Sequence, residues 1–131
     1  MIFVDTGAWF ALSVPSDIDH LSAKQYIASN REQLVTTDYV IDELLTLFRV
    51  RRQSQRALQW VVEVLGGNLF ELARVTPSDF DRAMSIYRDF SDKQWSFTDC
   101  TSFAVMERLS IATAFAFDDH FRQFGSITIH P

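Results

Sequence analysis

Four carboxylates, far apart in the sequence, occupy positions from which they could act together: Asp5, Glu43, Asp99 and Asp118. Carboxylate oxygens are the ligands that Mg²⁺ and Mn²⁺ prefer, and these ions keep part of their water shell. A cation held in this way can activate a water molecule for attack on a phosphodiester and stabilise the leaving oxygen. The four residues therefore predict a metal-dependent hydrolytic site, provided that the fold brings them together.

Basic side chains that could neutralise such a cluster are scarce. Lys24 and Lys93 are the only lysines of the chain. Because no histidine stands out as a candidate base, we expect a metal-activated water to be the nucleophile. We interpret all three histidines as surface residues rather than ligands: His20, His120 and His130.

The elements that would position the acids alternate between strands and helices. This alternation predicts an α/β fold, with a central, mostly parallel, five-stranded sheet and helices on both faces. We expect one domain, spanning residues 1–131. The predicted strands are 2–4, 34–36, 69–75, 111–117 and 127–129; the predicted helices are one capped by Asp17 or Asp19 and ending near Ser29, then about 38–52, 54–65, 77–90 and 98–109.

Two of the acids follow predicted strands. In open parallel sheets, ligands bind beyond the carboxyl ends of the strands. Asp5 directly follows the first predicted strand and Asp118 directly follows the fourth. If these strands are neighbours, the two carboxylates meet at one edge, although either residue alone could equally be a turn or cap residue.

The other two acids lie on predicted helices. With Thr98 as the predicted N-cap, Asp99 lies in the first helical turn, where the helix dipole favours a carboxylate. Phe103 and Met106 follow four and seven positions later on the same stripe, so Asp99 should point inward, where an unpaired carboxylate is costly. Glu43 lies at the margin of an apolar helix face, where it could equally be a rim residue.

Four segments together resemble a known family. The chain is similar to a PIN domain, specifically a VapC-type toxin of a toxin–antitoxin pair. The resemblance implies an α/β nuclease with an acidic metal site, Mg²⁺- or Mn²⁺-dependent cleavage of RNA, homodimerisation and inhibition by a cognate antitoxin. The segments occur in the expected order and spacing: "FVDTGAWFAL", "TTDYVIDELLTL", "SFTDCTSFAVM" and "FAFDDHFRQFG".

The resemblance also implies roles for the acids. Asp5 and Asp99 would bind the principal metal ion, Glu43 the ion or its water, and Asp118 would complete the site. Two hydroxyls are candidates for holding the carboxylates, with turn and cap roles as the alternative: Thr6 and Thr98.

The chain departs from the family pattern at two positions. Gly7 stands where many relatives have Ser, and Ala116 where Thr is frequent. The resemblance places Asp118 as the fourth acid, so we expect Asp119 to turn outward and cap the segment that follows.

Composition limits the other function classes. The net charge of −5 argues against a protein that mainly grips nucleic-acid phosphates, but it is compatible with a nuclease whose acids bind cations. The single Cys100 excludes an internal disulfide. With no apolar run of membrane-spanning length and no secretory signal, we expect a cytoplasmic protein without membrane contact.

Three alternative functions deserve comparison. The "DTG" of Asp5–Gly7 occurs in aspartic proteases, but those enzymes are all-β and need a second aspartate from a matching loop. A metal-dependent phosphatase or phospho-acceptor domain also places Asp after its first strand, yet Gly7 stands where its second acid would be. A non-catalytic RNA-binding PIN domain is the third alternative, and the presence of all four acids argues against it.

Two further features could contact RNA. On one continuous helix, Arg49, Arg52 and Arg56 form a stripe opposite Glu43, which predicts a solvated face or an antitoxin contact. Trp95 could stack on RNA bases or fold onto the core.

Overall fold

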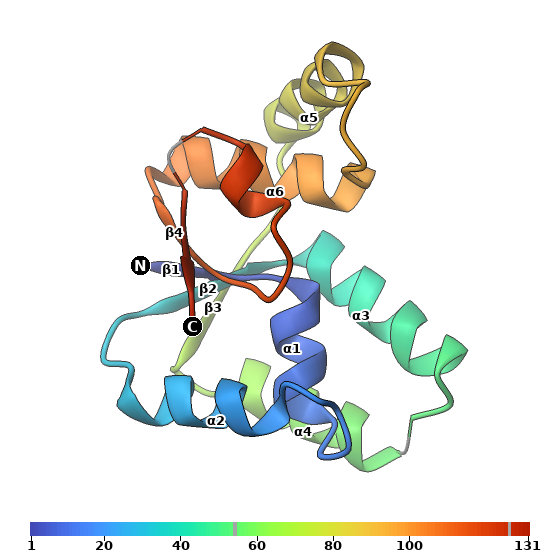
Figure 1. Cartoon of the computed structure of the whole chain (residues 1–131), viewed down its shortest axis with the longest axis vertical. Helices are drawn as coiled ribbons and strands as arrows, with labels where there is room; N and C mark the ends of the chain where they lie inside the picture. Colours follow the sequence, from blue (N-terminus) through green and yellow to red (C-terminus); the bar gives the residue numbers. More distant parts are fainter. Residues whose placement is uncertain (54, 126) are drawn as a thin grey trace.

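The computed structural model describes residues 1–53, 55–125 and 127–131, and it shows an α/β fold built on one five-stranded sheet (Figure 1). All strand pairs are parallel, in the order β3-β2-β1-β4-β5. The predicted fold class is therefore confirmed, although β3 and β4 are shorter than expected. The strands are β1 (Ile2–Val4), β2 (Leu34–Thr37), β3 (Phe70–Ala73), β4 (Thr113–Phe115) and β5 (Thr128–His130).

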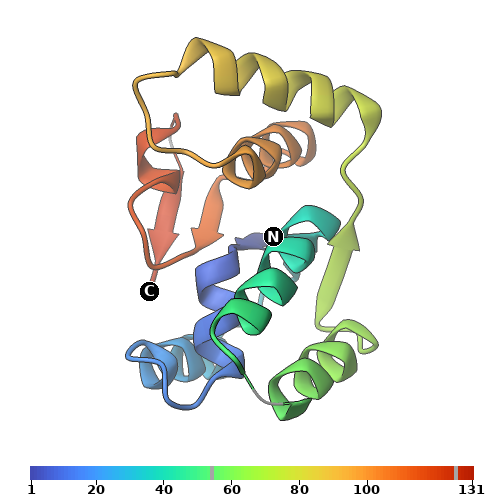
Figure 2. The ribbon, with the colours of Figure 1, turned by 90° about the vertical axis from the view of Figure 1, so that its right-hand side faces the viewer.

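Helices cover both faces of the sheet. Figures 1 and 2 show α5 and α6 on one side, and α1, α2 and α4 on the other. Among the described residues, no helix has the length and apolar character needed to cross a bilayer. The helices are α1 (Thr6–Ser13), α2 (His20–Ser29), α3 (Asp38–Val50), α4 (Gln55–Leu65), α5 (Pro77–Asp89) and α6 (Phe97–Leu109), with a short 3₁₀ helix η1 (Phe121–Gln123).

The strand order reverses between β1 and β4. From β1 the chain winds outward to β2 and β3, and then returns to place β4 on the other side of β1. The Asp5 amide donates a hydrogen bond to the Phe115 carbonyl (3.1 Å), which ties the ends of these two strands together. Such a reversal is where open α/β sheets bind their ligands.

The helix α1 is absent from our sequence prediction, for a clear physical reason. All of its residues except Gly7 are buried, so it has no polar face and no helical periodicity. Its Trp9 is fully buried, and the indole N–H donates to the Thr36 hydroxyl (2.9 Å) of the neighbouring strand. A core helix of this kind positions Asp5, its N-cap residue, at the end of β1.

Several predicted boundaries need correction. The strand β4 ends at Phe115, so Asp118 does not follow it directly. The predicted continuous helix through Arg52 is wrong: α3 ends at Val50, and Arg52 adopts a left-handed backbone conformation (φ 52°) before α4. Our start of the next helix, Ser54, lies outside the described residues.

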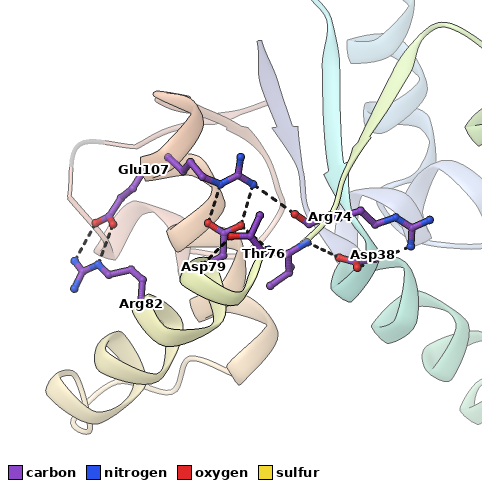
Figure 3. A network of polar contacts seen from close by, with 8 residues as sticks. Asp38, Arg74, Thr76, Asp79, Arg82 and Glu107 are labelled. Carbon is purple, nitrogen blue, oxygen red and sulfur yellow. Dashed lines mark hydrogen bonds and ion pairs between the residues drawn. The ribbon is translucent and has the colours of Figure 1, made fainter.

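A polar network fastens α5 to α6 and to the end of β3 (Figure 3). Thr76 and Asp79 form a capping box at the start of α5. Arg108 of α6 donates to both carboxylate oxygens of Asp79 (2.9 Å each), and Arg82 binds Glu107 in the same two-pronged way. This network holds the outer helix pair, and with it the start of α6, in place.

Candidate active site

Asp5 is the most deeply buried acid of the predicted cluster. Its residue is 3% exposed, and it lies between the end of β1 and the start of α1. Burial raises the pKa of Asp5 well above its ordinary value, because the charged form loses its water. The carboxylates of Asp118 and Asp99 raise the pKa of Asp5 further, and Glu43 contributes less, while the Thr6 amide acts in the opposite direction.

Asp99 is also buried, and it belongs to a capping box. Ser96, rather than the predicted Thr98, caps α6: its hydroxyl accepts from the Asp99 amide (3.0 Å), and Asp99 Oδ2 accepts from the Ser96 amide (3.1 Å). Burial raises the pKa of Asp99, and the Ser96 amide and His120 offset part of that shift. The acid therefore both caps a helix and faces the other carboxylates.

Asp118 and Glu43 form the more accessible side of the cluster. Asp118 lies in the loop between β4 and η1, and its side chain is 48% exposed. Glu43 is partly buried in the second turn of α3, the helix that starts where β2 ends. The structure thus brings the other three predicted acids, from three separate segments, close enough for their charges to act on Asp5.

The neighbouring Asp119 differs from Asp118. Its side chain is 75% exposed and pairs with Arg122 (3.1 Å), one turn along. The Asp119 side chain turns outward as expected. The predicted side-chain cap is not seen in the described residues: the Arg122 amide donates to the backbone carbonyl of Asp119, not to its carboxylate. The charge of Asp118 raises the pKa of both Asp5 and Asp99, so the geometry favours Asp118 as the fourth acid.

The two predicted supporting hydroxyls behave differently. The Thr6 hydroxyl is buried and has no hydrogen-bond partner among the described residues. A buried polar atom without a partner is costly, so this oxygen is suited to a water or ion beside Asp5. Thr98 lies inside α6, and in the described part of the chain its side chain bonds to none of the four acids.

His120, which we interpreted from the sequence as a surface residue, contacts the acid cluster. His120 Nδ1 lies 3.0 Å from Asp99 Oδ2 and 4.0 Å from Asp118 Oδ2, and the ring is about a third exposed. The interpretation of His120 as a surface residue is therefore wrong. Its position in the tight turn after Asp118 was the available signal, because a residue two positions on can fold back over the acid.

The donor set fits a hard divalent cation. Within the described residues, none of the four acids forms an ion pair with a lysine or arginine. No three His, Cys, Asp or Glu side chains of that part already surround a common point at ligand distance. Carboxylates without a basic partner repel one another, and a divalent cation between them would remove this repulsion. Because Mg²⁺ commonly keeps several waters as ligands, a few carboxylates and the Thr6 hydroxyl would be enough to bind it.

The two departures from the family pattern both lack a side-chain hydroxyl. A Cβ built on Gly7 would lie 3.9 Å from Asp5 Oδ2, an ordinary contact, so a serine would fit beside the first acid. Ala116 is buried at the end of β4 and offers no hydroxyl. The hydroxyl nearest Asp5 in sequence is therefore that of Thr6.

The other RNA-binding candidates change with the structure. Trp95 is buried, stacks edge-on against Phe103 and donates to the Gln123 side chain (3.0 Å), so it is a core residue. The predicted arginine stripe does not lie on one helix, because Arg49 belongs to α3, Arg52 follows its end and Arg56 belongs to α4. The guanidinium of the neighbouring Arg51 lies over the Phe10 ring (5.2 Å).

Comparison with known proteins agrees with this geometry. The family model described as "PIN domain" matches residues 2–127. The 23S rRNA-specific endonuclease VapC20 of Mycobacterium tuberculosis is 34% identical over 131 residues, which are 100% of this chain and 99% of that protein. Ribonuclease VapC26 of the same organism is 26% identical over 117 residues, 89% of this chain and 86% of that protein.

Solved structures give the same result. The crystal structure of M. tuberculosis VapC20, described as a sarcin–ricin loop cleaving toxin, superposes with a TM-score of 0.92 at 33% identity and covers 100% of both chains. A toxin–antitoxin complex from Klebsiella pneumoniae superposes with a TM-score of 0.70 over 98% of this chain and 96% of that chain. At 12% identity, the second likeness is one of fold alone.

Proposed function

The chain belongs to the PIN-domain family and is an endoribonuclease toxin of the VapC type, and on that premise we propose how its site works. Asp5 and Asp99 are the principal ligands of a divalent cation, Mg²⁺ or Mn²⁺, with Glu43 on the ion or its water. Asp118 completes the cluster. PIN-domain nucleases of this type are generally metal-dependent, and the observation that carries the assignment is the convergence of four carboxylates without a lysine or arginine partner among the described residues.

Electrostatics supports a cation in this role. RNA is a polyanion, and a phosphodiester cannot approach several clustered carboxylates unless cations lie between them. When bound, the divalent cation would polarise the phosphoryl group and lower the pKa of a water molecule. The chain itself holds the ligands: β1 and α1 fix Asp5, the capping box fixes Asp99, and the Thr6 hydroxyl supplies a further oxygen.

The RNA target is proposed from the relatives. VapC20, at 34% identity over the whole chain, is named as specific for 23S rRNA, so 23S rRNA is the first substrate to test. Action on ribosomes would place the toxin in the cytoplasm. Fragments from 23S rRNA with transfer and messenger RNA left intact would support this target, and the reverse pattern would exclude it.

Two partners complete the proposal. We expect a cognate antitoxin, since VapC20 is described as a toxin. We also expect a homodimer, and α5 is a candidate contact because its Phe80, Met84 and Tyr87 side chains are exposed. Co-expression with the cognate antitoxin, to be sought among small genes beside that of the toxin, should relieve growth arrest. Light scattering should give twice the monomer mass.

Purified protein and RNA test the proposed site directly. Cleavage should require Mg²⁺ or Mn²⁺, stop in EDTA and fall at least about a hundredfold in Asp5→Asn and Asp99→Asn. Activity that survives in chelator or in both variants would refute the metal site. Release of phosphate from small phosphomonoesters, with RNA left intact, would instead favour the phosphatase alternative.

A further inference from the structure

His120 connects two of the four acids. Its ring Nδ1 lies 3.0 Å from Asp99 Oδ2, and its backbone amide donates to Asp118 Oδ1 (3.0 Å). One residue thereby links an acid on α6 to an acid in the loop after β4. No lysine or arginine of the described chain pairs with either acid, so His120 is the basic residue that contacts both of them.

The packing around His120 fixes this position. The next residue, Phe121, is fully buried, and its ring lies 5.1 Å from that of Phe103 and 5.9 Å from that of Phe3. Phe103 follows Asp99 by one helical turn, so both residues lie on one stripe of α6. The contact between Phe121 and Phe103 therefore sets the imidazole of His120 beside the carboxylate of Asp99.

The hydrogen bonds of Asp99 distinguish its two oxygens. Oδ2 accepts from the Ser96 amide (3.1 Å) and lies in hydrogen-bond contact with His120 (3.0 Å). A carboxylate oxygen has two in-plane lone pairs, so two such donors occupy Oδ2. Oδ1 accepts no hydrogen bond from the described residues, and it is the oxygen left for a cation.

We propose that His120 is a positioning residue of the metal site, which donates through Nδ1 to Asp99 Oδ2 and so presents Oδ1 to the cation. The inference rests on the proposed function, because it needs a cation among the acids. Partners of this kind orient metal-binding carboxylates, and their loss typically weakens metal affinity about 10- to 100-fold. This role does not involve the Nε2 atom of the His120 ring, and it does not require contact between His120 and the RNA.

An asparagine and a glutamine at this position separate the two ring nitrogens. Nδ1 of histidine and the amide nitrogen of asparagine are both bonded to Cγ, whereas the glutamine nitrogen is one bond further out, near the place of Nε2. The hydrogen-bond donor at the Nδ1 position should therefore be retained in His120→Asn and lost in His120→Gln and His120→Ala.

The affinity for Mn²⁺, measured by calorimetry on metal-depleted protein without RNA, tests the proposal. His120→Asn should bind Mn²⁺ within about threefold of the unchanged protein, and His120→Gln and His120→Ala about 10- to 100-fold more weakly. At saturating Mn²⁺, kcat should recover to within a few-fold in all three. Equal affinities in all three variants, or rescue by glutamine alone, would overturn the proposal.

A kcat deficit that persists at saturating metal would also overturn it, because a proton-transfer group typically contributes 10²- to 10⁴-fold to the rate. His20 provides the matched control, since its Nδ1 contacts the Ala11 carbonyl (2.7 Å) outside the acid cluster. His20→Gln should leave Mn²⁺ affinity unchanged. Thermal melts identify any variant that does not fold. If the alanine variant does not fold, the comparison of His120→Asn with His120→Gln still tests the proposal.

The outcomes also separate this inference from the proposed function. If the unchanged protein binds no Mn²⁺ and cleaves no RNA, the metal site itself is refuted and the inference falls with it. If the unchanged protein binds Mn²⁺ and cleaves RNA, but the glutamine and alanine variants match it, only the role of His120 is refuted.

Discussion

Two aspartates of this protein share the same local structure and have opposite electrostatics. Asp79 and Asp99 are each the third residue of a helix, each closes a capping box, and each is nearly inaccessible, at 3% and 6% exposed. The pKa of Asp79 is lowered, because hydrogen bonds from Arg108 and the Thr76 cap outweigh the effect of burial. The pKa of Asp99 is raised, because burial and the charge of Asp118 outweigh its hydrogen bonds.

The difference lies in the partner that the fold supplies. Arg108 satisfies both oxygens of Asp79 and neutralises its charge, so this acid contributes to stability (Figure 3). Among the described residues, Asp99 is contacted by His120 and the Ser96 amide, both on one oxygen, and it faces other acids. Such an arrangement lowers the free energy of unfolding of the metal-free protein, as is common at functional sites.

The largest expected effect separates the two aspartates by activity. Asp99→Asn should lower RNA cleavage by at least about a hundredfold, because it removes a proposed cation ligand. Asp79→Asn should keep kcat within about twofold at a temperature where it is folded, since the Asp79 side chain bonds, within the described part of the chain, to the helix cap and Arg108 and to none of the four acids. Cleavage assays on both variants test this, and equal losses would contradict the division of roles.

Removal of the partner should affect the stability of the paired aspartate. Arg108→Met should lower the free energy of unfolding by about 2 kcal/mol, because Asp79 is left buried with only its cap. The value lies below that for a fully buried pair, since the Arg108 side chain is 38% exposed. Urea denaturation measures this change.

Arg82→Met is the matched control for that variant. Arg82 binds Glu107 with similar geometry, but both side chains are more than 40% exposed, at 46% and 42%. Its loss should cost no more than about 1 kcal/mol, the usual upper value for a surface pair. If Arg82→Met lowers the free energy of unfolding more than Arg108→Met does, burial does not determine the strength of these two ion pairs.

The lowered pKa of Asp79 also predicts a pH dependence. A carboxyl with a lowered folded-state pKa stabilises the fold above its unfolded pKa of about 3.9, and this contribution is lost as pH falls through the folded value. The stability advantage of the unchanged protein over Asp79→Asn should therefore be constant near neutral pH and shrink below about pH 4. An advantage that persists at pH 2 would show that the ion pair is not its source.

The unpaired acids predict a smaller effect of opposite sign. Asp5→Asn should raise the free energy of unfolding in EDTA by about 1–2 kcal/mol, because a buried charge without a cationic partner is removed. Added Mg²⁺ should stabilise the unchanged protein and not the variant, so the gain should shrink or reverse. Thermal melts with and without Mg²⁺ measure both changes, and a destabilised variant in EDTA would contradict the prediction.

The smallest effect concerns the outward acid of the "DD" pair. Asp119→Asn should change the free energy of unfolding by less than about 0.5 kcal/mol and cleavage by less than about twofold, because its pair with Arg122 is exposed. Asp118→Asn, in contrast, should weaken cleavage. The reverse outcome in the same assay would show that Asp119 is the fourth acid.

The sequence by itself determined the fold class, and it nominated the four acids of the proposed site. Strands and helices alternate in an order that allows few parallel topologies, and an acid that directly follows a strand lies at the carboxyl edge of the sheet, so Asp5 could be nominated without coordinates. Asp118 was nominated by the same reasoning, but it lies in the loop after β4, which ends at Phe115. The helix α1 escaped prediction because a helix buried on all sides has no periodicity to read.

Only the tertiary structure decided which charged groups meet. The segments "TPSD" and "SFTD" both predict an acid in the first turn of a helix, and nothing within either segment indicates that Arg108 pairs with one and His120 contacts the other. Those contacts join residues 29 and 21 positions apart through the packing of α5 on α6 and of Phe121 on Phe103. Local sequence sets where a carboxylate stands, but its charge depends on burial and on partners that distant parts of the chain supply.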